Sequence, residues 1–356
     1  MIKVLHSADW HLDSPLQGRS PAQTQRLRDA LLRLPRMVVE AARAEGCHMI
    51  LLSGDLFDGP CSAESLQAVS RALAEAEMPV FISPGNHDPF RPGSPWQQTD
   101  WPENVHIFSG EQVQSVAIPA LDCRVYGRAF TGAYADSVQR LRAAGEEAIH
   151  IGLLHADPTQ PDSPYCPITT RQIQDSGMTY LALGHIHKGG QLRAGDTLCA
   201  WPGSPMGRGF DEPGKRGVLV VTIDENCSAQ PLFLDTPRFY EFTCEVDGDA
   251  AAAIAGVLPA AGSEDFYRVT LTGESTPPDL AALQQEFSQF PNLQLRDDTV
   301  PPVDLWAGAG EDTLEGIYFR LLQQALEGQD AHNRRQILLA AKLSRQLLEG
   351  GEVKLP

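Results

Sequence analysis

The sequence predicts an α/β fold in which strands and helices alternate along the chain. Short runs rich in Ile, Leu and Val, each of strand length, recur through the first ~190 residues. Each run is followed directly by a polar stretch that contains histidine or aspartate, and helical patterns separate the first three runs. Alternation of this kind, with polar residues collected at the strand ends, is typical of a layered α/β core.

The expected core elements follow in chain order. The strands of this part are Lys3–His6, Met49–Ser53, Val80–Ser83, Ile149–Leu154 and Tyr180–Leu183. A helix begins at Ser20-Pro21 and stops at Gly46, and we expect Pro35 to kink or split it because proline removes a backbone donor. A second helix is expected over Ser62–Ala76, before Met78-Pro79.

After His187 the pattern changes to apolar runs without intervening helices. We expect three antiparallel strands that close the core: Leu198–Trp201, Gly217–Ile223 and Gln230–Leu234. Residues 1–235 therefore form the predicted main domain, and residues 236–299 a small α/β cap-like domain. The cap-like domain is expected to run strand, helix, strand, helix and strand over Phe239–Val246, Ala250–Leu258, Asp265–Thr272, Leu280–Phe287 and Leu293–Arg296.

The C-terminal part is predicted to be helical. Residues 300–312, with two prolines and several small residues, are typical of a linker. Residues 313–356 form a helical segment, with helices expected over Thr313–Glu327 and Ala331–Glu349. In the second helix an apolar stripe of Leu339, Leu343 and Leu347 either packs on the protein's own core or docks a partner.

Composition restricts the class of protein. No apolar stretch is long enough to span a bilayer, so we expect no membrane partner. The seven cysteines are odd in number and contain no Cys-x-x-Cys pair, which favours reduced thiols and a cytoplasmic location. The formal net charge of −18 argues against nucleic-acid binding at first sight, although total charge governs solubility more than it governs a site. Five arginines between Ser14 and Arg36 form a local cationic stretch, and they fit a nucleic-acid contact and a solvated helix face equally well.

Five short motifs carry the chemistry, and each follows an apolar run. They are Asp9-x-His11, Gly54-Asp55-x-x-Asp58, Gly85-Asn86-His87-Asp88, a single His155, and Gly184-His185-x-His187. Carboxylate, amide and imidazole groups are suitable ligands for two metal ions that hydrolyse phosphoesters. Each motif alone has an ordinary explanation, such as a helix N-cap for Asp55 or a turn for Asn86-His87. All five together, at strand ends where α/β sheets place their ligands, predict a site.

The residues of the third motif also suggest a division of roles. The imidazole of His87 can reach a scissile phosphate rather than a metal ion, and there it can stabilise developing charge or donate a proton. Asp88 is then expected to orient that imidazole. Asp58 fits a supporting residue better than a ligand.

The order of these motifs resembles that of the calcineurin-like metallophosphoesterases. The stretch from His6 to Pro15, Gly184–Lys188, and Pro202–Pro205 followed by Gly207-Arg208 and Glu212 resemble the DNA repair exonuclease branch, which holds the SbcD- and YhaO-type nucleases. The resemblance covers residues 1–235 by motif and the remainder only by layout. It implies a four-layer αββα sandwich, extended here by the small α/β cap-like module and the C-terminal helices.

The resemblance also implies a role for each matching position. Asp9, His11 and His187 would hold one metal ion, Asn86, His155 and His185 the other, and Asp55 would bridge them. His87 would act on the transition state, with Asp88 as its partner. Both ions would be Mn²⁺, and the reaction would be in-line attack of an activated water on a phosphodiester.

Three functions follow from these expectations. The first is a Mn²⁺-dependent DNA nuclease, an exonuclease with endonuclease activity left open, which works in DNA repair. In this family the helices after the cap dock on an SMC-like coiled-coil ATPase, so residues 313–356 are the expected contact, and a homodimer is a further family expectation. The second function is hydrolysis of a small phosphodiester or phosphomonoester, which the acidic charge favours. The third is a non-catalytic scaffold that has kept the fold.

Overall fold

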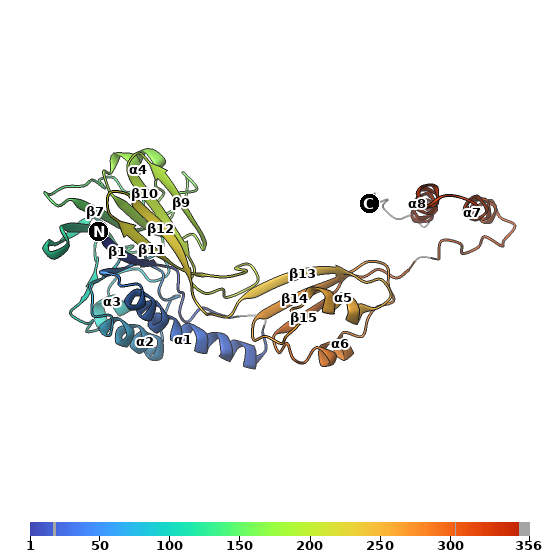
Figure 1. The fold of residues 1–356 in the computed structure, drawn as a ribbon, viewed down its shortest axis with the longest axis horizontal. Helices are drawn as coiled ribbons and strands as arrows, with labels where there is room; N and C mark the ends of the chain where they lie inside the picture. Colours follow the sequence, from blue (N-terminus) through green and yellow to red (C-terminus); the bar gives the residue numbers. More distant parts are fainter. Residues whose placement is uncertain (17–18, 303, 349–356) are drawn as a thin grey trace. The chain divides into compact units, whose positions relative to one another are not determined.

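The computed structural model describes residues 1–16, 19–302 and 304–348 (Figure 1). Contacts divide the chain into two compact units. The N-terminal unit comprises residues 1–241 with the segments 264–268 and 290–292, and the C-terminal unit comprises the rest. The N-terminal unit contains all the motif residues.

The first sheet of the N-terminal unit has six strands in the order β12-β11-β1-β2-β3-β4. These strands are β1 (Ile2–Ser7), β2 (Met49–Leu52), β3 (Val80–Ile82), β4 (Val105–Ile107), β11 (Gly217–Ile223) and β12 (Cys227–Phe233). Strands β1 to β4 run parallel, whereas β11 pairs antiparallel with both β1 and β12. The carboxyl ends of β1, β2 and β3 therefore lie along one edge of this sheet.

The second sheet also has six strands, in the order β5-β6-β7-β8-β10-β9. They are β5 (Gln114–Ile118), β6 (Cys123–Gly127), β7 (Ile149–His155), β8 (Tyr180–Gly184), β9 (Lys188–Ala194) and β10 (Thr197–Gly203). Strands β6, β7, β8 and β10 are parallel, and antiparallel strands β5 and β9 close the two edges. Here β7 and β8 bring their carboxyl ends together.

The two sheets pack face to face and helices cover the outer faces, as predicted (Figure 1). Alternation along β2 shows how the layers form: Met49 and Leu51 enter the core between the sheets, whereas Ile50 and Leu52 face the helix layer. That helix layer is α1 (Pro21–Ala44) and α2 (Ala63–Ala74). The second sheet is covered by α4 (Thr170–Asp175) and by part of the segment 126–143, while α3 (Pro95–Gln98) and η1 (Pro119–Leu121) are short. The result is a four-layer αββα sandwich.

Helix α1 runs unbroken through the buried Pro35, so the proline does not split it, because a long helix tolerates one missing hydrogen bond when its apolar face is packed. One local expectation was wrong. Strand β10 pairs parallel with β8 in the second sheet, whereas β11 and β12 belong to the first, so the three predicted closing strands do not form one antiparallel group. Strands β4, β5, β6 and β9 were not anticipated.

The small module after the sandwich contains a three-stranded sheet in the order β13-β14-β15. Its elements are β13 (Phe239–Glu245), α5 (Ala250–Val257), β14 (Phe266–Thr272), α6 (Leu280–Glu286) and β15 (Leu293–Asp297). They alternate between strand and helix along the chain. Asp249 and Asp279 accept hydrogen bonds from backbone N–H groups at the first turns of α5 and α6, which fixes where these helices begin.

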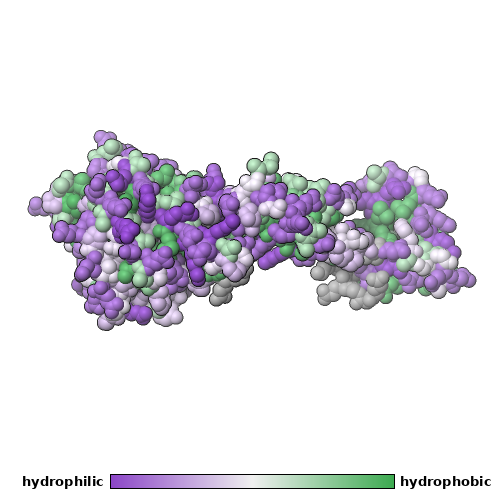
Figure 2. Space-filling view, turned by 90° about the horizontal axis from the view of Figure 1, so that it is seen from below, coloured by the Kyte–Doolittle hydropathy of each residue, from purple (hydrophilic) through white to green (hydrophobic). Residues whose placement is uncertain are grey.

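The helices α7 (Leu314–Ala325) and α8 (Ala331–Leu348) pack on each other around a small core. Phe319 is fully buried, and the guanidinium of Arg345 lies 3.9 Å from its ring centroid. The predicted leucine stripe is not part of this core: Leu339 is 37% and Leu347 is 63% exposed. Figure 2 shows hydrophobic surface on this helical part. Residues 349–356 of the predicted helical segment lie outside the described residues.

Among the described residues, no helix is both long and apolar enough to cross a bilayer.

A buried histidine between the two sheets should make stability depend on pH. His6 contacts the Tyr180 hydroxyl through Nδ1 and the Ser53 hydroxyl through Nε2, both at 2.8 Å, and burial lowers its pKa to about 3. An unfolded chain takes up this proton near pH 6.5, whereas the folded chain does not until pH falls to about 3, so acidification between these values favours unfolding. His6 should therefore remove about 1.4 kcal/mol of stability per pH unit below ~6.5.

Urea unfolding of the EDTA-treated protein from about pH 7 to about pH 5 measures this effect. His6→Gln should flatten the dependence of the unfolding free energy on pH, and the exposed His332→Gln should not. Equal slopes for His6→Gln and the wild type would contradict the assignment.

Candidate metal centre

Both sheets contribute residues to one site at the carboxyl ends of their strands. The predicted ligands follow or end five different strands: Asp9 and His11 follow β1, Asp55 follows β2, Asn86 follows β3, His155 ends β7, and His185 and His187 follow β8. The loop after β1 runs beside the loop after β2, since the Asp9 and His11 N–H groups donate to the carbonyls of Gly54 and Asp55 at 3.0 Å. The site is therefore shared between the sheets.

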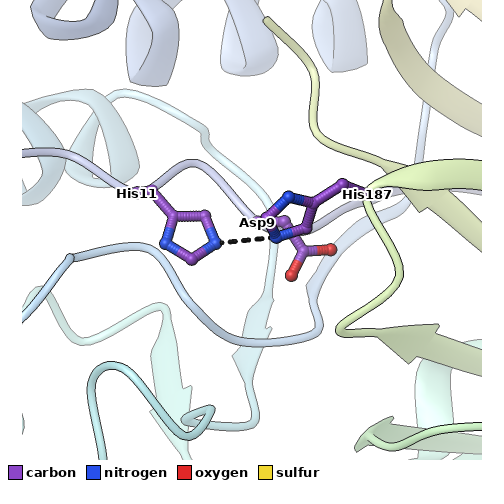
Figure 3. A group of neighbouring side chains, drawn as sticks. All are labelled: Asp9, His11 and His187. Carbon is purple, nitrogen blue, oxygen red and sulfur yellow. Dashed lines mark hydrogen bonds between the residues drawn. The ribbon is translucent and has the colours of Figure 1, made fainter. Parts of the chain in front are cut away.

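The first group of candidate ligands is Asp9, His11 and His187 (Figure 3). One donor atom from each lies within 4.8 Å of the others. The two imidazoles point toward each other, with their Nε2 atoms 3.1 Å apart. Two imidazole nitrogens and a carboxylate that converge in this way fit a divalent cation that accepts both nitrogen and oxygen ligands.

The second group surrounds His155. Its Nε2 lies 2.9 Å from Oδ1 of Asn86 and 3.2 Å from Oδ2 of Asp55, and its ring centroid is 5.3 Å from that of His185. The same Oδ2 of Asp55 lies 3.7 Å from Nε2 of His11 in the first group. A single carboxylate oxygen thus sits between the two groups, which is the arrangement that a bridging ligand requires.

The backbone is strained at the candidate ligands. Asp9, His11, Asp55 and His185 all have positive φ angles, of 55°, 48°, 54° and 90°. Residues other than glycine adopt this region at a cost, and such residues gather at functional sites where the surrounding fold holds them. The strain turns these side chains into the shared site.

Three glycines let the loops approach closely enough. A Cβ on Gly184 would lie 2.0 Å from the Ser53 carbonyl oxygen, and one on Gly85 would lie 2.2 Å from Oδ1 of Asp55. A Cβ on Gly54 would lie 2.7 Å from Nδ1 of His155, and its φ is +89°. These contacts explain why the motifs contain Gly directly before Asp55, Asn86 and His185.

Hydrogen bonds orient the imidazoles. The Nδ1–H of His155 donates to the Ser53 carbonyl at 2.8 Å, and the Nδ1–H of His187 donates to Oε1 of Glu212 at 2.8 Å. Each bond leaves Nε2 directed at the site, as in metal centres whose ligands are held by a carboxylate or a carbonyl. Glu212 is 3% exposed and also binds the guanidinium of Arg208 at 2.9 Å. In the sequence Arg208 and Glu212 stand out only as family markers, and their part in the site becomes visible in these contacts.

The candidate ligands differ in protonation before any cation binds. Burial acts to lower the pKa of His155, but the carboxylate of Asp55 outweighs it and raises that pKa to about 9. Burial lowers the pKa of His11 to about 3 and that of His185 to about 4, so both are neutral near pH 7, the form that binds metals. Burial acts to raise the pKa of Asp55, but His155 and His11 outweigh it and hold the carboxylate ionised. The buried Nδ1 of His11 has no hydrogen-bond partner among the described residues. The donor set fits two divalent cations.

The predicted pairing of His87 with Asp88 is not what the structure shows. Asp88 is buried and accepts backbone N–H groups from the two motif loops: Gly85 and Asp55 donate to its Oδ1, and Leu56 and Phe57 to its Oδ2, at 2.7–3.2 Å. Nδ1 of His87 instead contacts Oδ1 of Asp58 at 2.7 Å, which raises the pKa of His87. Asp58 thus holds the position expected of Asp88, and Asp88 fastens the loops.

His87 is far more exposed than the candidate ligands His11 and His155, while the candidate ligand His187 is 37% exposed. The side chain of His87 is 45% exposed, whereas those of His11 and His155 are 1% and 0% exposed. The ring of His87 lies at the edge of the site, 4.8 Å from the His11 ring centroid in a T-shaped contact. His11, Asp58 and His87 also place one donor atom each within 4.8 Å of one another, so His87 could itself be a metal ligand. The metal content of a His87 variant distinguishes that role from action on the substrate.

Glu212 should support metal binding without touching the ion. Glu212→Gln removes the carboxylate that holds Nδ1 of His187, and we expect Mn²⁺ affinity to fall about 10- to 100-fold. Calorimetric titration of the metal-free protein with Mn²⁺ measures the change. Glu225→Gln, at an exposed turn of the same unit, is the matched control. Unchanged Mn²⁺ affinity in Glu212→Gln would show that His187 is held by other contacts.

Comparison with known proteins finds a family that matches more than half of this chain. The model of the family described as calcineurin-like phosphoesterase matches residues 2–189, which contain every predicted ligand. Among curated proteins, the chain is 33% identical over 236 residues to the metallophosphoesterase YhaO of Bacillus subtilis, covering 62% of this chain and 57% of that relative. It is 27% identical over 263 residues to a subunit of the nuclease SbcCD of the same organism, covering 62% of this chain and 66% of the relative.

A shorter match joins the chain to a third protein. It is 40% identical over 92 residues to the DNA double-strand break repair protein Mre11 of Aeropyrum pernix, covering 25% of this chain and 21% of that protein. The matched region thus spans less than two thirds of each of these relatives. Solved structures that match include TT1561 of Thermus thermophilus, with a TM-score of 0.41, 14% identity and 65% of this chain covered against 98% of TT1561. A dimetal phosphatase of Danio rerio matches with a TM-score of 0.43 and 13% identity, covering 65% of this chain and 96% of the phosphatase.

Proposed function

Because the chain belongs to the calcineurin-like phosphoesterase family, whose members are metal-dependent phosphoester hydrolases, we propose that it is a Mn²⁺-dependent DNA nuclease. The observation that carries this proposal is that Oδ2 of Asp55 lies between the imidazoles of His11 and His155. The side chain of His87 lies beside this group and is 45% exposed, so it is accessible to a substrate. Similarity to the SbcCD nuclease subunit and to Mre11, whose names describe a nuclease and a double-strand break repair protein, supports DNA as the substrate and repair as the setting.

Each residue has a defined part in the proposed reaction. Asp9, His11 and His187 would hold one ion, Asn86, His155 and His185 the second, and Asp55 both. When bound, the two ions supply Lewis-acid stabilisation of the phosphate and activate a water for in-line attack.

The proton chemistry belongs to His87 and Asp58. The hydrogen bond to Asp58 raises the pKa of His87 and so favours its imidazolium form, which would stabilise charge on the phosphate and donate a proton to the leaving oxygen. Asp88 keeps the loops of Asp55 and His87 in register.

The surface beside the site suits a phosphate backbone. A cavity of about 510 Å³ is lined by two arginines, Arg19 and Arg208, and by three acidic residues, Asp58, Asp211 and Glu212. Arg208 brings a guanidinium to within 3.1 Å of the His187 ring, where a neighbouring phosphate of the substrate would lie. The two guanidinium groups offer contacts to phosphate oxygens, although the lining, like the whole chain with its net charge of −18, carries more acidic than basic groups.

Cleavage of linear and circular DNA in Mn²⁺ tests the proposal. End-labelled duplex and single-stranded DNA should be cut in a reaction that Asp55→Asn abolishes, and loss of label from the ends with circular DNA intact would identify an exonuclease. Nicking of circles would add endonuclease activity. No Asp55-dependent cleavage of any of these DNAs would overturn the proposal.

A small phosphoester is the second candidate substrate, and the acidic charge is the observation that favours it. Anionic polymers are repelled by a surface of the same sign, whereas a small phosphoester is less affected. Fast hydrolysis of nucleotides and of bis(p-nitrophenyl) phosphate, without salt-sensitive DNA binding, would favour this function over the nuclease.

We also propose that α7 and α8 dock on the coiled coil of an SMC-like ATPase. The exposed leucines support this contact, because Leu314, Leu321 and Leu347 are 87%, 59% and 63% exposed while the small core of the two helices is already filled. Leu347→Glu should abolish co-purification with such an ATPase and leave Mn²⁺ binding unchanged. We further propose that the chain forms a homodimer, which light scattering tests. We also propose a cytoplasmic location, which the seven unpaired cysteines support.

A further inference from the structure

The largest cavity described lies away from the cavity beside Arg208 and has no role in the reaction described above. It has a volume of about 580 Å³ and is lined by Arg128, Thr131, Tyr134, Asp136 and Arg140, among others. This volume falls in the usual range of sites for small molecules and is sufficient for one nucleotide. Tyr134, which is 68% exposed, presents an aromatic ring at the surface there.

A chain of ring contacts joins the cavity to the metal centre. The rings of Tyr134 and Tyr165 lie 5.7 Å apart at 35°, and the ring of Tyr165 lies 4.8 Å from that of the candidate ligand His185 at 40°. Backbone hydrogen bonds fix this chain, because the Ala135 N–H donates to the Pro164 carbonyl at 3.0 Å and the Cys166 N–H to the Ala135 carbonyl at 2.7 Å. Tyr134 is thus held two rings away from the metal centre.

A second set of contacts joins the cavity wall to the loop after β3, which contains Asn86 and His87. The Phe130 ring lies 5.5 Å from the ring of His155, and its backbone bonds both Pro84 and Phe90, on either side of Asn86 and His87. The segment from Arg128 to Ala135 therefore borders both the cavity and the second group of candidate ligands.

The polar groups of the cavity suit a nucleotide. In the described part of the chain, Arg128 and Arg140 form no ion pair, and the one hydrogen bond of the Arg128 guanidinium goes to the backbone carbonyl of Asp136 at 3.3 Å. Two guanidinium groups without carboxylate partners favour phosphate oxygens. Asp136 and Glu111, which also line the cavity, offer acceptors to the exocyclic amines of a base.

We propose that this cavity binds the unpaired nucleotide next to the scissile phosphate, with its base stacked on Tyr134. The inference rests on the proposed nuclease function and adds its substrate class: a DNA strand whose terminal nucleotides are single-stranded. A base held in a duplex cannot leave its stack to enter such a cavity without unpairing. Blunt duplex ends must therefore fray before cleavage, whereas single-stranded ends enter directly. Tyr134 is a specificity-determining residue, since it recognises the base and not the bond that breaks.

A cycle that combines protein and substrate changes tests the stacking. Cleavage of end-labelled single-stranded DNA is compared between the wild type and Tyr134→Ala, on normal DNA and on DNA with abasic residues placed in turn beside the labelled terminal bond. On normal DNA, Tyr134→Ala should lower kcat/KM by about 5- to 100-fold, mainly through KM. Where the missing base is the one that stacks, the same substitution should have almost no effect, because its partner is already absent.

Two further variants define the contact. Tyr134→Phe keeps the ring and should restore the wild-type kcat/KM, and Tyr318→Ala, an exposed tyrosine on α7, should not change it. Equal losses for Tyr134→Ala on normal DNA and on every abasic DNA would overturn the inference while leaving the nuclease function intact. So would an unchanged kcat/KM. A wild type that cuts duplex DNA but neither single-stranded DNA would overturn this inference alone, and one that cuts none of the duplex, single-stranded and circular DNAs would overturn the nuclease function as well.

Discussion

Replacing His87 with alanine should lower kcat by about 10²- to 10⁴-fold and leave the number of bound Mn²⁺ ions unchanged. The imidazole sits at the edge of the site, half exposed, and Asp58 raises its pKa, so it is placed to act on the substrate. The candidate ligands His11, Asp55 and His155 are instead buried, and a carbonyl holds His155 while a carboxylate holds His187. Steady-state kinetics together with the metal content of the purified variant measures both quantities.

Asp58→Asn is the companion variant. It removes the hydrogen bond that raises the pKa of His87, so the pKa falls and the protonated form disappears at lower pH. The basic limb of the kcat profile should therefore move toward lower pH, while the profile of His87→Ala loses that limb. A loss of one Mn²⁺ ion in His87→Ala would make His87 a ligand, and a kcat equal to that of the wild type would remove it from catalysis.

Gly184→Ala should weaken metal binding while the protein remains folded. The added methyl group would lie 2.0 Å from the Ser53 carbonyl and 2.9 Å from Nδ1 of His155, so the ends of β2 and β8 must separate. Ser53 belongs to the first sheet and His155 to the second, and a displacement of about 1 Å between them is enough to lower kcat/KM by ~10²-fold. Elemental analysis should find fewer than two Mn²⁺ ions per chain.

The matched control is Gly256→Ala. Gly256 lies on α5 in the C-terminal unit, and a Cβ there would meet no atom within 4 Å. Circular dichroism and thermal unfolding report whether the Gly184→Ala protein is folded, with a destabilisation of about 1–3 kcal/mol expected from overpacking. Full Mn²⁺ occupancy and activity in folded Gly184→Ala would show that the sheets move apart without cost to the site.

The positions of the candidate ligands could be predicted from the sequence because local pattern and topology agree there. Each motif follows an apolar run, and parallel strands in one sheet end at the same edge, so Asp9, Asp55 and Asn86 had to gather. His155 and His185 come from the other sheet; the strand-end pattern predicted that all five motifs form one site, but not that two sheets share it. The structure explains that relation through Gly184 and Ser53, where the two sheets touch.

The partner of His87 could not be predicted because it depends on contacts distant in sequence. Asp88 is adjacent in the chain and was the natural choice, but the N–H groups of Leu56 and Phe57 draw its carboxylate away. Asp58 lies 29 residues from His87 and reaches it only after the loops of β2 and β3 are aligned. Asp58 and Asp88 have the same side-chain chemistry, and Asp58 is the partner of His87 because buried backbone N–H groups need the Asp88 carboxylate as their acceptor.

The edge strands were missed for a different reason. Strand β9 has the sequence KGGQLRA, in which two glycines and three polar residues give no apolar alternation, and it forms because β10 offers a partner. That hairpin also places β10 beside β8, which is why its parallel pairing was not foreseen. Strand identity at these positions is set by tertiary pairing and not by local preference.

The sharing of the site between two sheets has a kinetic consequence. The N–H of His185 binds the carboxylate of Asp9 across 176 residues of chain, so the site closes only when both sheets have formed and met. Contacts with such long sequence separation form late on the folding pathway and are absent from an early transition state. Mn²⁺ would therefore leave the refolding rate almost unchanged and slow unfolding instead. The ions would stabilise the sandwich after it has folded and would not speed its folding.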